Sequence, residues 1–163
     1  PNAEDIEKID IRSSKYTMHL LAEPCKWAPR NIVDLQFSMP YQAAIAFKNG
    51  KFTVDELNTD YINDELVKRL IAATTVVMDD EFERRYPAHY SSAVTITMKD
   101  GTQYSATVDD PVTYEDVVNK FRYLANRTYK GDTERTEKIV DFVNHLEEQP
   151  DMAKLMELVN DVK

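Results

Sequence analysis

Apolar and polar positions alternate most clearly over residues 94–108, where two alternating runs flank the dipeptide Asp100-Gly101. Side chains of a strand point to opposite faces in turn, and an Asp-Gly pair between two such runs is typical of a β-hairpin with a type I′ turn. A third run covers 6–12, and the β-branched run "TTVVMDD" at 74–80 indicates a fourth strand. The pattern therefore predicts a sheet of about four strands that is at least partly antiparallel.

Helical spacing of apolar residues is found on both sides of these runs. Residues 15–23 predict a short helix that ends before Pro24, and residues 32–48 predict a longer helix interrupted by Pro40. Asn49-Gly50 follows this helix and suits a left-handed cap at its C-terminus.

Capping residues indicate where further helices begin. Thr53 and Glu56 have the spacing of a capping box, and Asn63 precedes an apolar helical face. Three more helices are predicted to begin near Thr113, Thr133 and Pro150. We therefore expect an α+β fold: a partly antiparallel sheet of about four strands with helices packed on one face, plus C-terminal helices. We assign residues 1–130 to the α+β domain and residues 131–163 to a helical extension of that domain.

Composition and charge narrow the class of partner. The chain has 163 residues, 42% hydrophobic and 30% charged, and its net charge is −9. No run of basic residues is longer than two, so we expect neither nucleic acid nor an anionic membrane as a partner. No apolar run approaches the length that spans a bilayer. Cys25 is the single cysteine, so no internal disulfide forms, which suits a reducing compartment and predicts a cytoplasmic protein.

The common catalytic and metal-binding patterns are absent from the sequence. The three histidines lie far apart, without the spacing of a metal-binding pair, and neither a glycine-rich phosphate loop nor a Gly-x-Ser-x-Gly turn occurs. A complete catalytic set is therefore absent by each of these patterns. His89 lies in a tyrosine-rich loop, where packing is the favoured role over ligand binding, and Cys25 is favoured as an inert thiol over a nucleophile.

The stretch "LQFSMPY" at 35–41 places the polar residues Gln36, Ser38 and Tyr41 in an apolar helical segment. Two interpretations are open. In the first, Pro40 begins a new helix at its first turn and Tyr41 packs in the core. In the second, the polar groups face a partner or ligand, because polar groups on an otherwise buried helix need a hydrogen-bond partner.

Several segments in order resemble the C-terminal domain of the MmgE/PrpD family. They are "DIEKIDIR" at the start, "DLQFSMPYQAAIAFKNG" up to Gly50, the hairpin "VTITMKDGTQYSATV" and the helix "VVNKFRYLA". The resemblance covers about Glu4 to Ala125, and "QFSMPY" is its most specific part. The family includes 2-methylcitrate dehydratase, cis-aconitate decarboxylase and iminodisuccinate epimerase.

The resemblance implies two-domain enzymes, typically homodimers, with the active site in a cleft between a large helical domain and a smaller α+β domain. This chain would be the smaller domain of a 2-methylcitrate dehydratase-like lyase that acts on a small di- or tricarboxylate. We expect it to be a piece of a longer protein, with an N-terminal helical domain as its partner, and to be inactive alone. The resemblance implies no metal and no organic cofactor.

The same resemblance assigns roles to two residues. Tyr41 aligns with a tyrosine that lines the cleft and is the predicted catalytic residue, with Pro40 turning its hydroxyl out of the domain. Ser38, one turn earlier, is a weaker candidate for substrate binding. Decarboxylase and epimerase remain alternatives within the family, and a non-catalytic interaction module is the alternative outside it. Lys26, Arg30 and Lys48 are the nearest cations to the motif, with solvated surface positions favoured for each.

Overall fold

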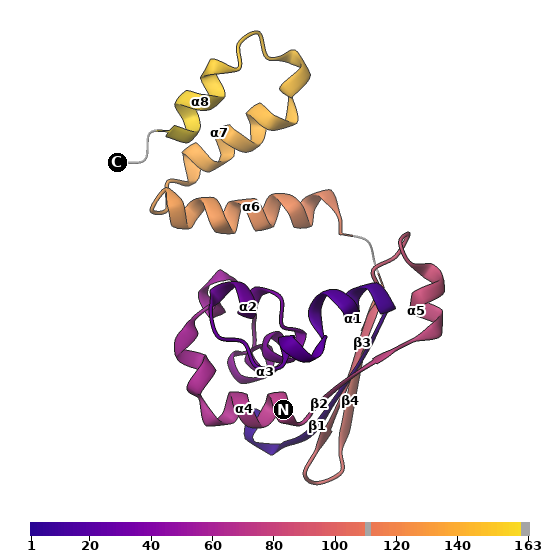
Figure 1. Cartoon of the computed structure of the whole chain (residues 1–163). Coiled ribbons are helices and arrows are strands. Elements are labelled where there is room, and N and C mark those ends of the chain that lie inside the picture. The colour runs from indigo at the N-terminus through magenta and orange to yellow at the C-terminus, as the bar shows by residue number, and fades with distance from the viewer. Residues whose placement is uncertain (110–111, 161–163) are drawn as a thin grey trace. The chain divides into compact units, whose positions relative to one another are not determined.

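The computed structural model describes residues 1–109 and 112–160, and the chain divides into two compact units, Pro1–Pro111 and Val112–Lys163. The first unit holds a sheet and short helices, and the second is helical (Figure 1). These elements confirm the expected α+β class with C-terminal helices.

The sheet of the first unit has four strands in the order β2-β1-β3-β4. Their bounds are Ile6–Ser13 (β1), Thr74–Met78 (β2), Ser92–Met98 (β3) and Gln103–Val108 (β4). β1 pairs in parallel with β2 and antiparallel with β3, and β3 pairs antiparallel with β4. The sheet is therefore mixed, which confirms the predicted sheet of about four strands that is at least partly antiparallel.

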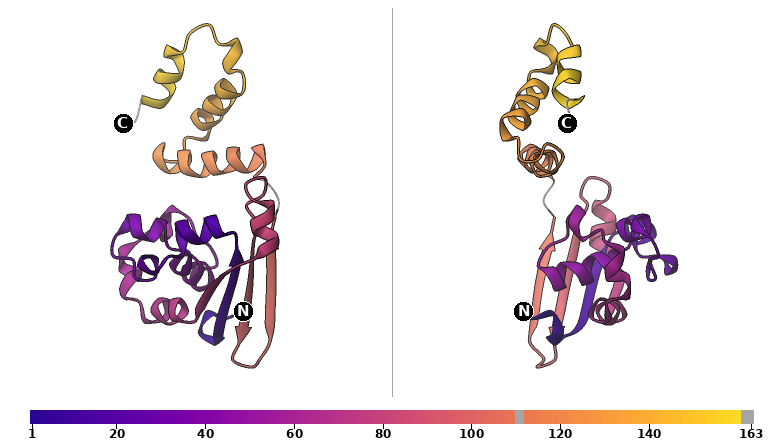
Figure 2. Two further views of the ribbon diagram at one scale, coloured as in Figure 1. Left: turned by 45° about the vertical axis from the view of Figure 1, so that its right-hand side comes forward. Right: turned by 90° about the vertical axis from the view of Figure 1, so that its left-hand side faces the viewer.

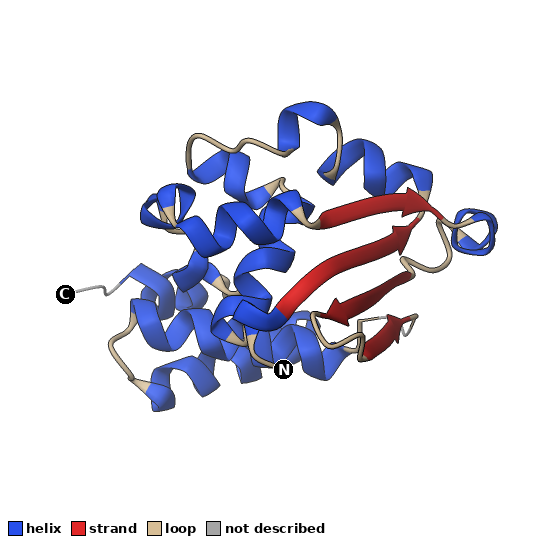
Figure 3. Ribbon diagram, turned by 90° about the horizontal axis from the view of Figure 1, so that it is seen from below, coloured by secondary structure: helices blue, strands red, loops and turns tan. Residues whose placement is uncertain are grey.

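Five α-helices connect these strands. Their bounds are Lys15–Leu21 (α1), Ile32–Gln36 (α2), Met39–Asn49 (α3), Glu65–Ala72 (α4) and Asp80–Arg85 (α5). The chain from β1 to β2 runs through α1 to α4, and α4 packs against β1 while α3 packs against β2. Figure 3 shows helices lying alongside the strands. Ile9, Ile11 and Ile96 on the sheet meet Ile45 and Leu70 on these helices in one buried core. This layer holds the "LQFSMPY" segment in place.

The helix predicted over 32–48 is two helices separated at Phe37 and Ser38. Pro40 lies in the first turn of α3, where its missing N–H costs no hydrogen bond. Gly50 ends α3 with a left-handed φ of 73°, as Asn49-Gly50 predicted. The predicted helix cap at Asn63 is wrong: Asp64 is the N-cap of α4, and its carboxylate accepts from the Val67 N–H at 3.0 Å.

The hairpin between β3 and β4 lies where the sequence predicted, but its turn is not type I′. That turn needs positive φ at both central residues, and of Asp100 and Gly101 only Gly101 has it, at 85°. The Gly101 N–H donates to the Met98 carbonyl at 2.9 Å, and the Met98 N–H to the Thr102 carbonyl at 2.8 Å. This is the longer hairpin loop in which a four-residue turn is followed by a left-handed glycine.

The described residues of the second unit form the α-helices Tyr114–Thr128 (α6), Thr133–Asn144 (α7) and Ala153–Asn160 (α8), with a short 3-10 helix at Leu146–Glu148 (Figure 2). Thr113 caps α6 in a capping box with Asp116, as the predicted start near Thr113 requires. Ile139 and Phe142 of α7 are buried in this unit. Residues 161–163 of the predicted extension lie outside the described residues. In the part of the chain that is described, no helix is long and apolar enough to cross a membrane.

Candidate functional site

Ser38 is the N-cap of α3. Its hydroxyl accepts a hydrogen bond from the Tyr41 N–H at 3.2 Å and donates one to the Lys26 carbonyl at 2.5 Å. The side chain is fully buried. It therefore joins the start of α3 to the preceding loop, and its hydroxyl proton is already donated within the domain.

Tyr41 is also fully buried, with an exposed fraction of 0%. Its hydroxyl lies 2.8 Å from the Glu56 carbonyl and 3.3 Å from the Asn58 carbonyl, to which it donates. Its ring meets Phe52 edge to face at 6.3 Å between ring centroids. Burial, aided by the neighbouring Tyr61, raises the pKa of Tyr41 to about 12.

The prediction that Pro40 turns the Tyr41 hydroxyl out of the domain is therefore wrong. Pro40 does begin the helix, but Tyr41, one residue later, lies on the buried face of α3 together with Ala44 and Ile45. The 53–58 segment supplies carbonyl acceptors inside the domain, so the hydroxyl is satisfied without reaching solvent. The structure thus shows the first of the two interpretations of "LQFSMPY", in which Tyr41 packs.

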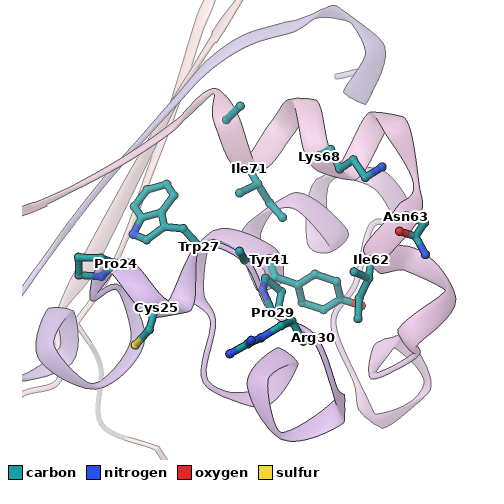
Figure 4. Close-up of a pocket in the computed structure, with 12 residues that line it drawn as sticks. Pro24, Cys25, Trp27, Pro29, Arg30, Tyr41, Ile62, Asn63, Lys68 and Ile71 are labelled. Carbon is teal, nitrogen blue, oxygen red and sulfur yellow. The ribbon is translucent and has the colours of Figure 1, made fainter.

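A pocket of about 750 Å³ lies directly beside this tyrosine (Figure 4). Its walls are the loop after α1, the turn before α4 and one face of α4, and the fully buried Tyr41 adjoins them. The lining residues are Pro24, Cys25, Trp27, Ala28, Pro29, Arg30, Tyr41, Ile62, Asn63, Lys68, Ile71 and Ala72. The volume is in the range of small-molecule sites, and the walls are largely apolar.

The charged groups on the pocket wall are all cationic. Arg30 enters from the loop and Lys68 from α4, and in Figure 4 they lie on either side of the Tyr41 ring. Lys68 forms an exposed ion pair with Glu65 at 2.9 Å. The Arg30 guanidinium has no ion pair or hydrogen bond to any described residue. Among the described residues, no carboxylate lines this pocket, although the full sequence carries 29 Asp and Glu.

The three cations proposed from the sequence have different positions. Arg30 lines the pocket, whereas Lys26 lies over the Phe37 ring at 5.5 Å and Lys48 pairs with Asp64. Lys68 was missed by sequence reasoning. The available signal was helical spacing, because Lys68, Ile71 and Ala72 lie at i, i+3 and i+4 on one face of α4.

The loop side of the pocket carries the only tryptophan and the only cysteine of the chain. The Trp27 indole N–H donates to the Ala22 carbonyl at 2.9 Å, which fixes the ring at the pocket wall. Cys25 is exposed at the same wall. Trp27 fluorescence and the alkylation rate of Cys25 can therefore be used to detect a ligand in the pocket.

His89 belongs to a separate polar cluster at the end of β4. Its Nδ1 lies 3.3 Å from the Asp109 carbonyl oxygen, and the Asp109 carboxylate pairs with Arg85 and accepts from the Ser91 hydroxyl. These contacts, the Ser91 hydrogen bond first, lower the pKa of Asp109. The neighbouring Tyr16, Tyr86 and Tyr90 rings pack together at 4.9 and 5.3 Å between ring centroids. The cluster joins α5 to the sheet, consistent with a packing role for His89.

Among the described residues, no group of three or more His, Cys, Asp or Glu side chains is arranged to hold a metal ion.

Comparison with known proteins identifies a family and a relative. Residues 1–146 match the family described as "MmgE/PrpD C-terminal domain". The chain is 27% identical over 145 residues to a cis-aconitate decarboxylase-like protein of Aspergillus oryzae. The aligned region covers 82% of this chain and 29% of that relative. This chain therefore spans less than a third of the length of the relative that it matches.

Proposed function

This chain belongs to the MmgE/PrpD family as its C-terminal domain, and on that basis we propose that it forms one wall of the active site of a lyase. The proposed substrate is a small di- or tricarboxylate. The observation that carries the proposal is the pocket beside Tyr41, which is large enough for such a molecule and has cations but no carboxylate on its wall. Its walls come from the family-matching segment, because every lining residue lies within 1–146.

The proposal includes a partner domain. The catalytic base and further cations would come from an N-terminal helical domain, which the relative's greater length leaves room for. We propose that the two domains close around the substrate and that the complete protein is a homodimer. The domain alone would then have no turnover.

The chemistry explains why cations matter at this site. In an elimination, a base removes a proton next to a carboxylate, the electron pair forms the C=C bond, and the hydroxyl leaves with a proton from an acid. In a decarboxylation, the C–C bond breaks, carbon dioxide leaves and the carbanion takes up a proton. Both routes build negative charge beside a carboxylate, and fixed cations stabilise that charge.

Two observations favour two different reactions for this site. The sequence resemblance favours dehydration of a 2-methylcitrate-like substrate, whereas the name of the Aspergillus relative favours decarboxylation of cis-aconitate. Both belong to the same proposal of a carboxylate lyase. An activity assay separates them, because the first reaction releases water and the second releases carbon dioxide.

The proton-donor role of Tyr41 stays a prediction within this proposal. It requires the hydroxyl to leave the Glu56 and Asn58 carbonyls when substrate binds. The bonds to these carbonyls and a pKa of about 12 make the hydroxyl a weak donor as it stands. The proposed substrate-binding role of Ser38 likewise requires its hydroxyl to release the Lys26 carbonyl and donate a hydrogen bond to the substrate instead.

The experiment is an assay of the complete protein, this domain together with its N-terminal domain, on 2-methylcitrate and on cis-aconitate. Turnover of either supports the proposal, and the isolated domain is the negative control. Lack of turnover on both substrates, together with a stable complex with an unrelated protein, would support the non-catalytic interaction module.

Tyr41→Phe in the complete protein tests the catalytic role of the tyrosine. An unchanged kcat excludes that role, and a fall in kcat with KM unchanged supports it.

A further inference from the structure

Among the described residues, the charged side chains that line the pocket are Arg30 and Lys68, and both are cationic. The whole chain has a net charge of −9, and several cations have acidic partners, among them Lys48 with Asp64 and Arg12 with Asp79. The Arg30 guanidinium, which lines the pocket, meets no acidic side chain in the described part of the chain. A cation that lacks a protein partner beside an apolar pocket is available to a ligand carboxylate.

The backbone that carries Arg30 is held in place. The Arg30 N–H donates to the Asp34 carboxylate at 2.9 Å, and the Asn31 side-chain amide donates to the same carboxylate at 3.0 Å. Pro29, immediately before, is buried. Asp34 therefore orders the loop through its backbone and leaves the guanidinium free, so that ligand binding need not order the loop first.

Lys68 supplies a second charge from a different element. Its neighbours on α4, Val67 and Leu70, are fully buried, so the helix that carries it is fixed against the core. Its present partner, Glu65, is exposed, and such a surface pair contributes little. A ligand carboxylate can therefore replace Glu65 at small cost.

We propose that Arg30 and Lys68 together anchor two carboxylates of one ligand, with the Arg30 guanidinium making the stronger, bidentate contact. The carbon chain between the carboxylates would lie against Trp27, Ile62 and Ile71, the apolar part of the wall. The class of ligand, a polycarboxylate, is taken from the proposed function, on which this inference rests. The inference adds that Arg30 and Lys68 of this domain select polycarboxylates over monocarboxylates.

The test uses the two reporters that the chain already contains. Tricarballylate, a saturated tricarboxylate, is titrated into the protein while Trp27 fluorescence is followed, and alkylation of Cys25 by iodoacetamide is timed with and without it. We expect a saturable change in Trp27 emission and slower alkylation of Cys25, with butyrate giving neither at the same concentration. A response to tricarballylate and butyrate alike would overturn the two-point contact.

Charge-removing variants identify the residues responsible. Arg30→Gln is expected to weaken tricarballylate binding about tenfold, and Lys68→Gln about threefold, because a bidentate charged contact is stronger than an exposed ammonium contact. Arg84→Gln removes the same charge from an exposed position on α5, away from the pocket residues, and is expected to leave binding unchanged. Equal binding by Arg30→Gln and wild type, equal weakening by Arg84→Gln, or no saturable response at tens of millimolar tricarballylate would each overturn the inference.

This failure is distinguishable from failure of the proposed function. If the complete protein turns over a carboxylate and Arg30→Gln leaves its KM unchanged, the lyase proposal stands and the anchor is wrong. If the domain binds tricarballylate through Arg30 but the complete protein has no lyase activity, the anchor stands and the lyase proposal is wrong.

Discussion

At Tyr41 a polar group lies inside the apolar core and joins α3 to the 53–58 segment. The hydroxyl meets the Glu56 and Asn58 carbonyls, and the ring packs against Phe52. Tyr41→Phe keeps the ring and removes the hydrogen bonds, which leaves the buried Glu56 carbonyl without this donor. We expect a loss of about 1–2 kcal/mol in the free energy of unfolding, measured by urea denaturation. A change within error would mean that the hydroxyl contributes nothing to the fold.

The same hydroxyl predicts a pH dependence of stability. The pKa of Tyr41 rises from 10.0 to about 12 in the folded state, because burial disfavours the phenolate. The unfolded chain therefore releases the proton first as pH rises, and stability is fully present below pH 10 and lost between pH 10 and about 12. One such group has a slope of about 1.4 kcal/mol per pH unit in that window. Tyr41→Phe removes this contribution, so its unfolding free energy should fall less steeply there than that of wild type.

At the scale of the element, the hairpin turn depends on one backbone conformation. Gly101 has a φ of 85°, and a Cβ placed there would meet no atom within 4 Å, so the cost of a side chain is conformational. Gly101→Ala is expected to reduce the free energy of unfolding by about 1 kcal/mol, and Gly101→Asn by less, because asparagine tolerates the left-handed region. Thermal denaturation of the two variants checks the order.

A companion variant separates the observed turn from a type I′ turn. Asp100 does not have positive φ, and its carboxylate accepts from the Thr102 N–H at 2.9 Å. Asp100→Gly should therefore lower the melting temperature, since it removes this contact and adds freedom to the unfolded chain. A type I′ turn would instead tolerate glycine there without loss.

At the scale of the whole molecule, local signals located most elements but not the contacts between them. The alternation around Asp100-Gly101 and the Thr113 capping residue each act within a few positions, so the sequence alone reveals them. The direction of the Tyr41 hydroxyl depends instead on carbonyls 15 and 17 positions away, and no local pattern encodes that approach.

The pocket could not be predicted from the sequence for the same reason. Arg30 was visible as a cation near the motif, but the fold alone brings Lys68 of α4 to the same cavity. The family resemblance correctly gave the family, whose description matches residues 1–146. It also led to the wrong orientation for Tyr41, whose side chain is fully buried and whose hydroxyl meets the Glu56 and Asn58 carbonyls inside the domain.

The two compact units make a last prediction about cooperativity. The main core of the first unit runs from Ala3 to Met98, and the second unit buries its own residues, Ile139 among them. Ile139→Val removes one methylene and should lower the free energy of unfolding by about 0.5–1.5 kcal/mol, as should the matched variant Ile45→Val in the first unit.

Trp27 lies in the first unit, so its fluorescence reports the unfolding of that unit, whereas far-UV circular dichroism reports the unfolding of both units. We expect Ile45→Val to lower the Trp27-detected midpoint, and Ile139→Val to lower part of the circular dichroism transition with the Trp27 midpoint unchanged. Equal shifts of the Trp27 midpoint in both variants would mean that the chain unfolds as one cooperative body.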